Sequence, residues 1–423
     1  MLDKLERLKE LALEKSNRFD IFHLKRFERD FVFTDKGVIG YEISESGQTS
    51  LRINYSGGIG FASAAGPFDE TELIEFAIET SKFNQGSLPL LYDVPTTSVK
   101  IFDEQIEKIE YPELLAYSNE TIDRIQGLAL QYECRIKTVI DHIIFSDADG
   151  RAKSYKKSML KVSFDAVGEE REHYNYRQAS CGYFGFINEI TETINRQKSA
   201  LPLIHDLECK TVNVILSPFG LYCAMKNFIA LKFNAKISVN EEEHPRDYFP
   251  GLSVYDSGIE DWKIGSQPFD DEGINCKVTP LMENGVINSY YYDLISADKF
   301  RLKSTGNGKR GWGIPPSPVP NNMIIIGDTR SENLIGTLNN GILIDYIVSD
   351  GRTDTINGIF CGNIMRGVLI KDGKMSHRIS NLNVRIDFNK TLQQGAVFGN
   401  DDSWIGGEFC SPSLLLHDVD IIE

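Results

Sequence analysis

The chain has 423 residues, of which 41% are hydrophobic and 25% are charged, as in an ordinary soluble globular protein. This length exceeds one usual hydrophobic core, and it predicts two or three domains of about 150 residues each. The net charge is −16, and no dense Lys/Arg cluster offsets it, so nucleic acid is not expected as a direct ligand.

The first 16 residues predict a charged amphipathic helix without the apolar core or cleavage site of a signal peptide. No run approaches the roughly 18 apolar residues that a membrane-spanning helix needs. The seven cysteines form no CxxC pair and read as reduced thiols. We therefore expect a cytoplasmic protein that does not contact the membrane.

The first half of the chain mixes the two kinds of secondary structure in blocks. Alternating or β-branched runs predict strands, and runs that begin with acidic residues predict helices. This arrangement favours an α+β fold over a doubly wound parallel sheet. The predicted strands are 20–29, 30–42, 51–55, 59–63, 134–145, 155–167 and 173–185, and the helices are 69–83, 111–132 and 188–197.

The segment 202–209, a proline followed by charged residues, is the best candidate for a domain boundary. We expect an N-terminal mixed α/β domain, 1–203, and a strand-rich C-terminal domain, 204–423, built as a barrel or a sandwich. The C-terminal prediction rests on short glycine-punctuated runs at 274–281, 286–292, 323–326, 342–348, 359–361, 367–370 and 384–386.

The segment 211–233 predicts a strand that feeds directly into a mostly apolar helix. Residues 211–216 alternate as a strand, and Ser217 and Pro218 are typical of a helix cap and first turn. Leu221, Met225 and Phe228 then recur at helical spacing. Such a rigid element is a suitable support for catalytic side chains.

The segment 265–274 places a proline, three consecutive acids and a glycine before a strand. Asp270 and Asp271 either present carboxylates to a cleft or form a tight turn in which the aspartate oxygens bind nearby main-chain N–H groups. The turn is the favoured interpretation.

The glycine-rich segment 304–311 lacks the GxxxxGK[ST] spacing of a phosphate loop. It suits a loop whose backbone approaches a ligand or peptide. We expect Lys309 and Arg310 to be exposed, and either to steer an acidic chain end or to be solvated.

The histidines offer no local zinc module, because none pairs with another at HxxxH or HExxH spacing. The acidic run before His173 is best interpreted as charges at a strand edge. No GxSxG nucleophile elbow is present, and Cys223 reads as a structural thiol among apolar neighbours. The residues alone therefore predict no catalytic group and no metal ligand.

Several short motifs together resemble the TldD/TldE family, in which TldE is also called PmbA and whose members were long labelled modulators of DNA gyrase. They occur in the family's order, cover essentially the whole chain, and are weak singly but fairly specific jointly. The matching segments are 51–53, 58–63, 145–150, 268–273, 283–286, 303–307, 326–328 and 397–401.

The resemblance implies a two-domain subunit that dimerises around a chamber. In that family, TldD-type members hold a catalytic zinc with an HExxxH helix and a further C-terminal ligand, and they cleave unfolded peptides or small proteins with a TldE-type partner. Aligned without gaps from Pro218, the motif's two histidines and glutamate fall at Lys226, Leu231 and Asn227. None of these can bind zinc or act as the general base, so the chain resembles the TldE branch.

The first functional hypothesis is thus a non-catalytic subunit of a zinc peptidase, with zinc only in a TldD-type partner and peptide bound at a sheet edge. The residues expected to line that surface are Asp270, Asp271, Thr305, Asn307 and Arg310. The alternatives are a stand-alone homodimeric peptide-binding or scaffold protein without catalysis, and an enzyme of unrelated mechanism that uses Cys361 or Asp–His pairs formed by the fold.

Overall fold

The computed structural model describes residues 2–92, 98–126, 130–168, 172–204, 207, 209–238 and 249–422. Its first half is a six-stranded antiparallel sheet in the order β3-β2-β1-β4-β5-β6. Long strands form because apolar and polar residues alternate along them. The strands are β1 (Phe19–Thr34), β2 (Gly37–Tyr55), β3 (Gly58–Ala65), β4 (Gln131–Asp147), β5 (Ala152–Val167) and β6 (His173–Ser180).

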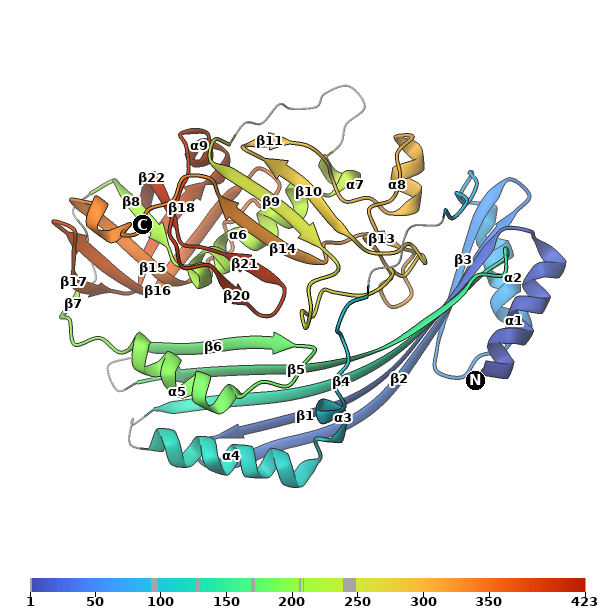
Figure 1. The fold of residues 1–423 in the computed structure, drawn as a ribbon, viewed down its shortest axis with the longest axis horizontal. Helices are drawn as coiled ribbons and strands as arrows, with labels where there is room; N and C mark the ends of the chain where they lie inside the picture. The colour runs from blue at the N-terminus through green and yellow to red at the C-terminus, as the bar shows by residue number, and fades with distance from the viewer. Residues whose placement is uncertain are drawn as a thin grey trace.

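Helices cover this sheet in two separate groups (Figure 1). At one end α1 (Leu2–Lys15) and α2 (Glu70–Ser81) pack on β3 and its neighbours, and Asp69 caps α2. At the other end α3 (Glu104–Lys108), α4 (Tyr111–Ile125) and α5 (Phe186–Gln197) cover an aromatic-rich core. The helix predicted at 111–132 therefore ends earlier, because β4 begins at Gln131.

The C-terminal half contains a closed barrel of five strands. Each strand pairs with the next in the circular order β15-β8-β22-β18-β16, and β16 returns to β15. β17 and β7 extend the barrel sheet beyond β16. The strands are β7 (Leu203–Ile204), β8 (Thr211–Leu216), β15 (Asn340–Ser349), β16 (Ile359–Lys371), β17 (Lys374–Ile379), β18 (Leu382–Asp387) and β22 (Leu414–Ile422).

A second six-stranded sheet, β11-β10-β9-β14-β21-β20, lies beside the barrel, and α6 (Pro218–Lys232) packs between them in the largest apolar core. Short elements complete this half. The sheet strands are β9 (Leu252–Ser257), β10 (Val278–Glu283), β11 (Val286–Ile287), β14 (Asn322–Gly327), β20 (Ser403–Ile405) and β21 (Phe409–Ser411). The short elements are α7 (Ala235–Ser238), α8 (Leu294–Lys299), α9 (Phe388–Gln393), η2 (Ile335–Thr337), β12 (Gly308–Lys309), β13 (Ser317–Pro318) and β19 (Val397–Phe398).

The predicted fold class, α+β with a strand-rich C-terminal barrel or sandwich, is confirmed, and the C-terminal half contains the barrel. The runs predicted at 359–361 and 367–370 form one strand, β16, because the glycines between them stay extended. Several strands were not predicted, among them β9, β17 and β22. The boundary predicted between 203 and 204 falls inside β7, which pairs with β17 of the barrel sheet.

Within the described ranges, no helix is long and apolar enough to cross a membrane. Parts of the predicted connector at 89–99 and of the acidic run before His173 lie outside the described residues, as do His205 and His244.

Candidate functional site

The strand–helix element at 211–233 forms as predicted. Ser217 caps α6 by accepting a hydrogen bond from the Gly220 N–H at 3.1 Å, and Pro218 occupies the first turn. The Ser217 hydroxyl also donates to Asp345 Oδ1 on β15, at 2.6 Å. These contacts fix the start of α6 to the barrel, and the apolar face of the helix fills the core.

Lys226, which the gap-free alignment from Pro218 assigns to the first zinc-motif histidine, holds an ion pair with Glu408 and lies 5.0 Å from the centre of the Tyr222 ring. Burial alone lowers the pKa of the Lys226 ammonium, but the carboxylate of Glu408 outweighs this effect and raises the pKa. The side chain therefore stays protonated and has no lone pair for a metal.

The other two positions of the motif are equally unsuited to zinc. Asn227 is exposed, and Leu231 is half-buried and carries no donor atom. In the part of the chain that the structure describes, no three His, Cys, Asp or Glu side chains gather as a metal site. Lys226, Asn227 and Leu231 therefore do not form a set of side chains that fits zinc.

The segment containing Asp270 is a tight turn held by its aspartate oxygens, which confirms the interpretation of this segment as a turn. Asp270 is fully buried; its Oδ1 accepts from the N–H groups of Glu272 and Ile274, and its Oδ2 accepts from Gly308 at 2.8 Å. Asp271 Oδ2 accepts from the Arg310 main-chain N–H at 2.8 Å. The two aspartates therefore tie the turn to β12.

Arg310 is not exposed, contrary to the sequence-based expectation. Its guanidinium pairs with Asp20 on β1 and donates to Ser50 on β2, and none of its side chain reaches solvent. Lys309 is half-buried and donates to Gln267. The expectation fails because the first sheet, distant in sequence, covers this loop.

A second arginine completes this contact. Arg52, on β2, is 1% exposed and lies between Asp20 and the Glu272 carboxylate of the C-terminal half. Burial raises the pKa of Asp20, but Arg310 and Arg52 together lower it below its ordinary value. Burial also raises the pKa of Glu272, which Arg52 only partly offsets. We call Asp20, Arg52, Glu272 and Arg310 the arginine bridge.

Thr305 and Asn307 belong to a buried polar cluster near this bridge. Thr305 donates to Asn307 Oδ1 at 2.6 Å, and Asn307 Nδ2 donates to Asp256 on β9 at 2.7 Å. Asn321 donates to the same carboxylate from its main-chain N–H. Burial raises the pKa of Asp256 to about 6, although these donors oppose the shift. The structure thus gathers all five residues predicted to bind substrate, four of them with buried side chains.

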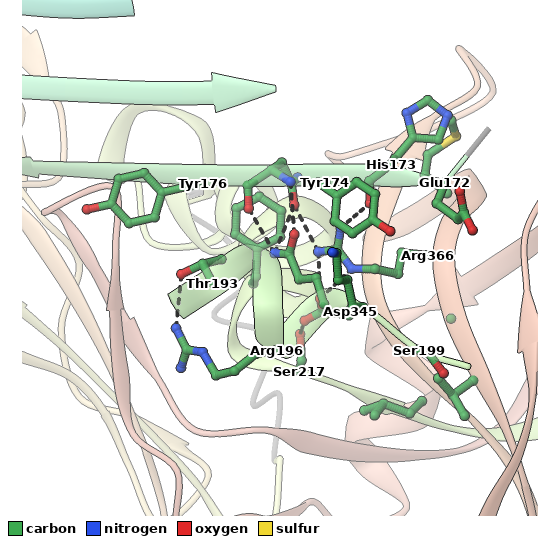
Figure 2. Close-up of a pocket in the computed structure, with 18 of the residues that line it drawn as sticks. Glu172, His173, Tyr174, Tyr176, Thr193, Arg196, Ser199, Ser217, Asp345 and Arg366 are labelled. Carbon is green, nitrogen blue, oxygen red and sulfur yellow. Dashed lines mark hydrogen bonds and ion pairs between the residues drawn. The ribbon is translucent and has the colours of Figure 1, made fainter. Parts of the chain in front are cut away.

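A cavity of about 660 Å³, which we call the interdomain pocket, lies where β6 and α5 meet the barrel and β20. In Figure 2, Tyr174 and Tyr176 mark its β6 side, and dashed lines join Asp345 to Arg366 and Ser217. The sequence did not predict it, because its residues come from separate strands and helices; His173 was interpreted as a strand-edge charge, and Ser217 and Pro218 only as a helix cap and first turn. The lining includes residues 172–178, Thr193, Arg196, Gln197, Phe219, Asp345, Arg366, Met375, Arg378 and residues 403–405.

Arg366, on β16, crosses the pocket to the first sheet. It pairs with Asp345 at 2.6 Å and donates to the His173 carbonyl at 2.7 Å and to Asn175 Oδ1 at 2.8 Å. Burial lowers the pKa of His173, and the nearby Arg366 charge lowers it further. The imidazole is therefore neutral at pH 7.

The sequence matches a family profile and several known proteins, and the fold matches solved structures. A family profile described as the PmbA/TldA metallopeptidase C-terminal domain matches residues 248–423. An uncharacterized protein of Methanocaldococcus jannaschii is 23% identical over 88% of this chain and 89% of its own length. A metalloprotease TldD homolog of Buchnera aphidicola is 32% identical, but over only 35% of this chain and 31% of that protein.

Two solved structures share the fold over nearly the whole chain. A putative modulator of a DNA gyrase from Thermotoga maritima has a TM-score of 0.85 at 17% identity, covering 99% of both chains. TldE from Thermococcus kodakarensis has a TM-score of 0.80 at 16% identity, covering 99% of this chain and 100% of its own. This chain therefore carries a PmbA/TldA-type C-terminal domain in residues 248–423, and it is a relative of the TldD/PmbA metalloproteases.

Proposed function

We propose that this chain is a non-catalytic, TldE/PmbA-like subunit of a zinc peptidase complex that cleaves unfolded peptides or small proteins. Its zinc-bearing partner is a TldD-type chain, and the complex is cytoplasmic. The observation that carries the proposal is the ion pair between Lys226 and Glu408. A cation with its own carboxylate partner stands where a peptidase of this kind needs an imidazole to hold zinc and activate water.

The fold supports the same proposal. The chain has the strand, the proline and the helix that would carry the zinc motif, without the side chains that would do the chemistry. A scaffold retained without its ligands suits a subunit that completes a chamber. In this proposal the two domains, 1–203 and 204–423, close one side of that chamber.

The test is a peptide-cleavage assay with metal analysis, on this chain alone, on a TldD-type partner alone and on their mixture. We expect activity only in the mixture, zinc only in the partner, and complete loss on chelation. Lys226→Met in this chain should leave that activity within about twofold, whereas replacing the HExxxH glutamate of the partner should abolish it.

Three results would contradict the proposal: no gain on mixing, zinc bound by this chain, or chelator-sensitive hydrolysis by this chain alone. A stable homodimer that ignores the partner and binds peptide without cleaving it would support the alternative, a stand-alone peptide-binding or scaffold protein. Activity that survives chelation but is lost on cysteine alkylation would point to an unrelated mechanism.

A further inference from the structure

The charged side chains that line the interdomain pocket have both signs, which suits a neutral ligand. Arg366 and Arg378 are half-buried, and each already has a carboxylate partner, Asp345 and Glu172 respectively. Aromatic and apolar side chains, among them Trp404, form much of the remaining wall. A cavity of this size, mostly apolar with a few polar groups, is typical of a ligand site.

The outer edge of β6 forms one wall of the pocket, and side chains occupy the place of a neighbouring strand. The His173 carbonyl accepts from Arg366, while the Asn175 N–H donates to Gln197 Oε1 at 3.0 Å and its C=O accepts from Gln197 Nε2 at 2.8 Å. Main-chain groups alternate in direction along a strand, so those of Arg177 also face this edge. Among the described residues, nothing pairs with the Arg177 N–H and C=O there.

Asn175 supplies a second unused group. Its side chain lines the pocket and is 3% exposed, and its Oδ1 accepts from Arg366 at 2.8 Å. Its Nδ2 has no partner within the described part of the chain. A buried donor left unpaired costs about 1–3 kcal/mol, which a ligand with an acceptor oxygen would recover.

We propose that the interdomain pocket binds a short apolar segment of an extended peptide. Apolar side chains of the segment lie against Trp404 and Met375, one carbonyl accepts from Asn175 Nδ2, and one residue pairs with the main chain of Arg177. A peptide is favoured over an apolar small molecule because a peptide unit supplies both the donor and the acceptor that β6 lacks. The inference rests on the proposed function for the role of a bound peptide, and it names the site in this chain that holds it.

The test is the binding of a fluorescently labelled, uncharged hexapeptide rich in leucine and valine to the purified chain, followed by anisotropy. Asn175→Asp keeps the acceptor for Arg366 and the shape of the side chain, but it replaces the free donor with a carboxylate. We expect its dissociation constant to rise about tenfold, as the loss of one hydrogen bond predicts. Asn188→Asp on α5 introduces the same charge at an exposed position outside the pocket, and it should bind like the wild type.

A second variant tests the apolar wall. Met375 is 46% exposed, so Met375→Glu should fold normally, and we expect it to weaken binding at least fivefold. Equal binding of a Gly/Ser hexapeptide, equal binding by Asn175→Asp, or no binding by the wild type would overturn the proposal.

These outcomes are separate from the test of the proposed function, because they use this chain alone and no cleavage. Peptide binding that responds to both variants, without activity on mixing, would overturn only the subunit role. Activity on mixing, without such binding, would overturn only the pocket assignment.

Discussion

Two of the places where the first sheet meets the C-terminal half differ sharply. At the arginine bridge, Arg52 and Arg310 are enclosed by carboxylates from both halves, and no side chain of the bridge is more than 7% exposed. At the interdomain pocket, Arg366 also crosses between the halves, but it leaves a cavity, an unpaired amide donor and an open strand edge beside it.

The arginine bridge holds the two halves together, whereas the interdomain pocket has room and free groups for a ligand. A buried polar network whose groups are all paired fixes one arrangement of the two halves and offers nothing to a ligand. A contact with spare donors and empty space can accept one. The residues in the most conspicuous sequence patterns, among them Asp270 and Arg310, lie at or near the arginine bridge. Most residues of the interdomain pocket lie in no sequence motif.

The largest expected effect is the loss of a buried cation from the arginine bridge. Arg52→Met should lower the free energy of unfolding by about 3–5 kcal/mol, because Asp20 and Glu272 then lose the buried cation that pairs with both of them. Denaturant unfolding measures the change. Lys25→Met, which removes an exposed ion pair with Glu45, is the matched control and should change stability by less than about 1 kcal/mol. Equal effects would mean that the bridge does not hold the halves together.

The polar cluster near the bridge should give a specific pH dependence. Burial raises the pKa of Asp256 from 3.8 to about 6, so the folded chain binds a proton more tightly than the unfolded chain does. Protonated Asp256 therefore stabilises the folded chain below about pH 4, and this stabilisation is lost as the pH rises to about 6. Relative to Asp256→Asn, the wild type should lose up to about 3 kcal/mol over that interval.

This comparison needs unfolding curves of both proteins at pH 4, 5, 6 and 7. Asp20 should behave oppositely, since its pKa is lowered in the folded chain, and its contribution is lost as the pH falls below about 4. A constant difference between wild type and Asp256→Asn from pH 4 to 7 would show that Asp256 has an ordinary pKa.

Substitution of Gly407, beside the interdomain pocket, should distinguish the cost of a steric clash from the cost of backbone strain. A Cβ on Gly407 would lie 1.9 Å from the Ala179 carbonyl oxygen of β6, and Gly407 has φ +75°. Gly407→Ala should therefore cost about 1–3 kcal/mol beyond the strain of a positive φ, and should push β6 away from β20. Gly351→Ala, with φ +86° and no atom within 4 Å, measures the strain alone. Similar losses in the two variants would show that the β6 contact is easily displaced.

The sequence predicted local elements well and their partners poorly. Residues 211–216, Ser217 and Pro218 specify β8 and the start of α6 by alternation and capping, which need no distant contact. Arg310 was expected to be exposed because nothing near it in sequence shows that Asp20, 290 positions earlier, covers it.

The interdomain pocket could not be predicted from the sequence, for a related reason. Asn175 and Arg366 each sit in an ordinary strand, and only the closure of the barrel against the first sheet brings them together. The expectation that α6 carries no zinc motif needs only the sequence, because residues 211–240 contain no histidine. That Glu408 pairs with Lys226 could not, since 182 positions separate them.

The smallest expected effect concerns this last pair, which joins Lys226 on α6 to Glu408 between β20 and β21. Lys226 and Glu408 are 26% and 32% exposed, so solvent screens their attraction. Glu408→Gln should therefore lower the free energy of unfolding by less than about 1 kcal/mol, in contrast to Arg52→Met. The same variant should not create zinc binding, because Leu231 offers no donor atom and Asn227 is a neutral amide. A loss as large as that of Arg52→Met would place the pair with the arginine bridge, as part of what holds the fold together rather than as a replaced metal site.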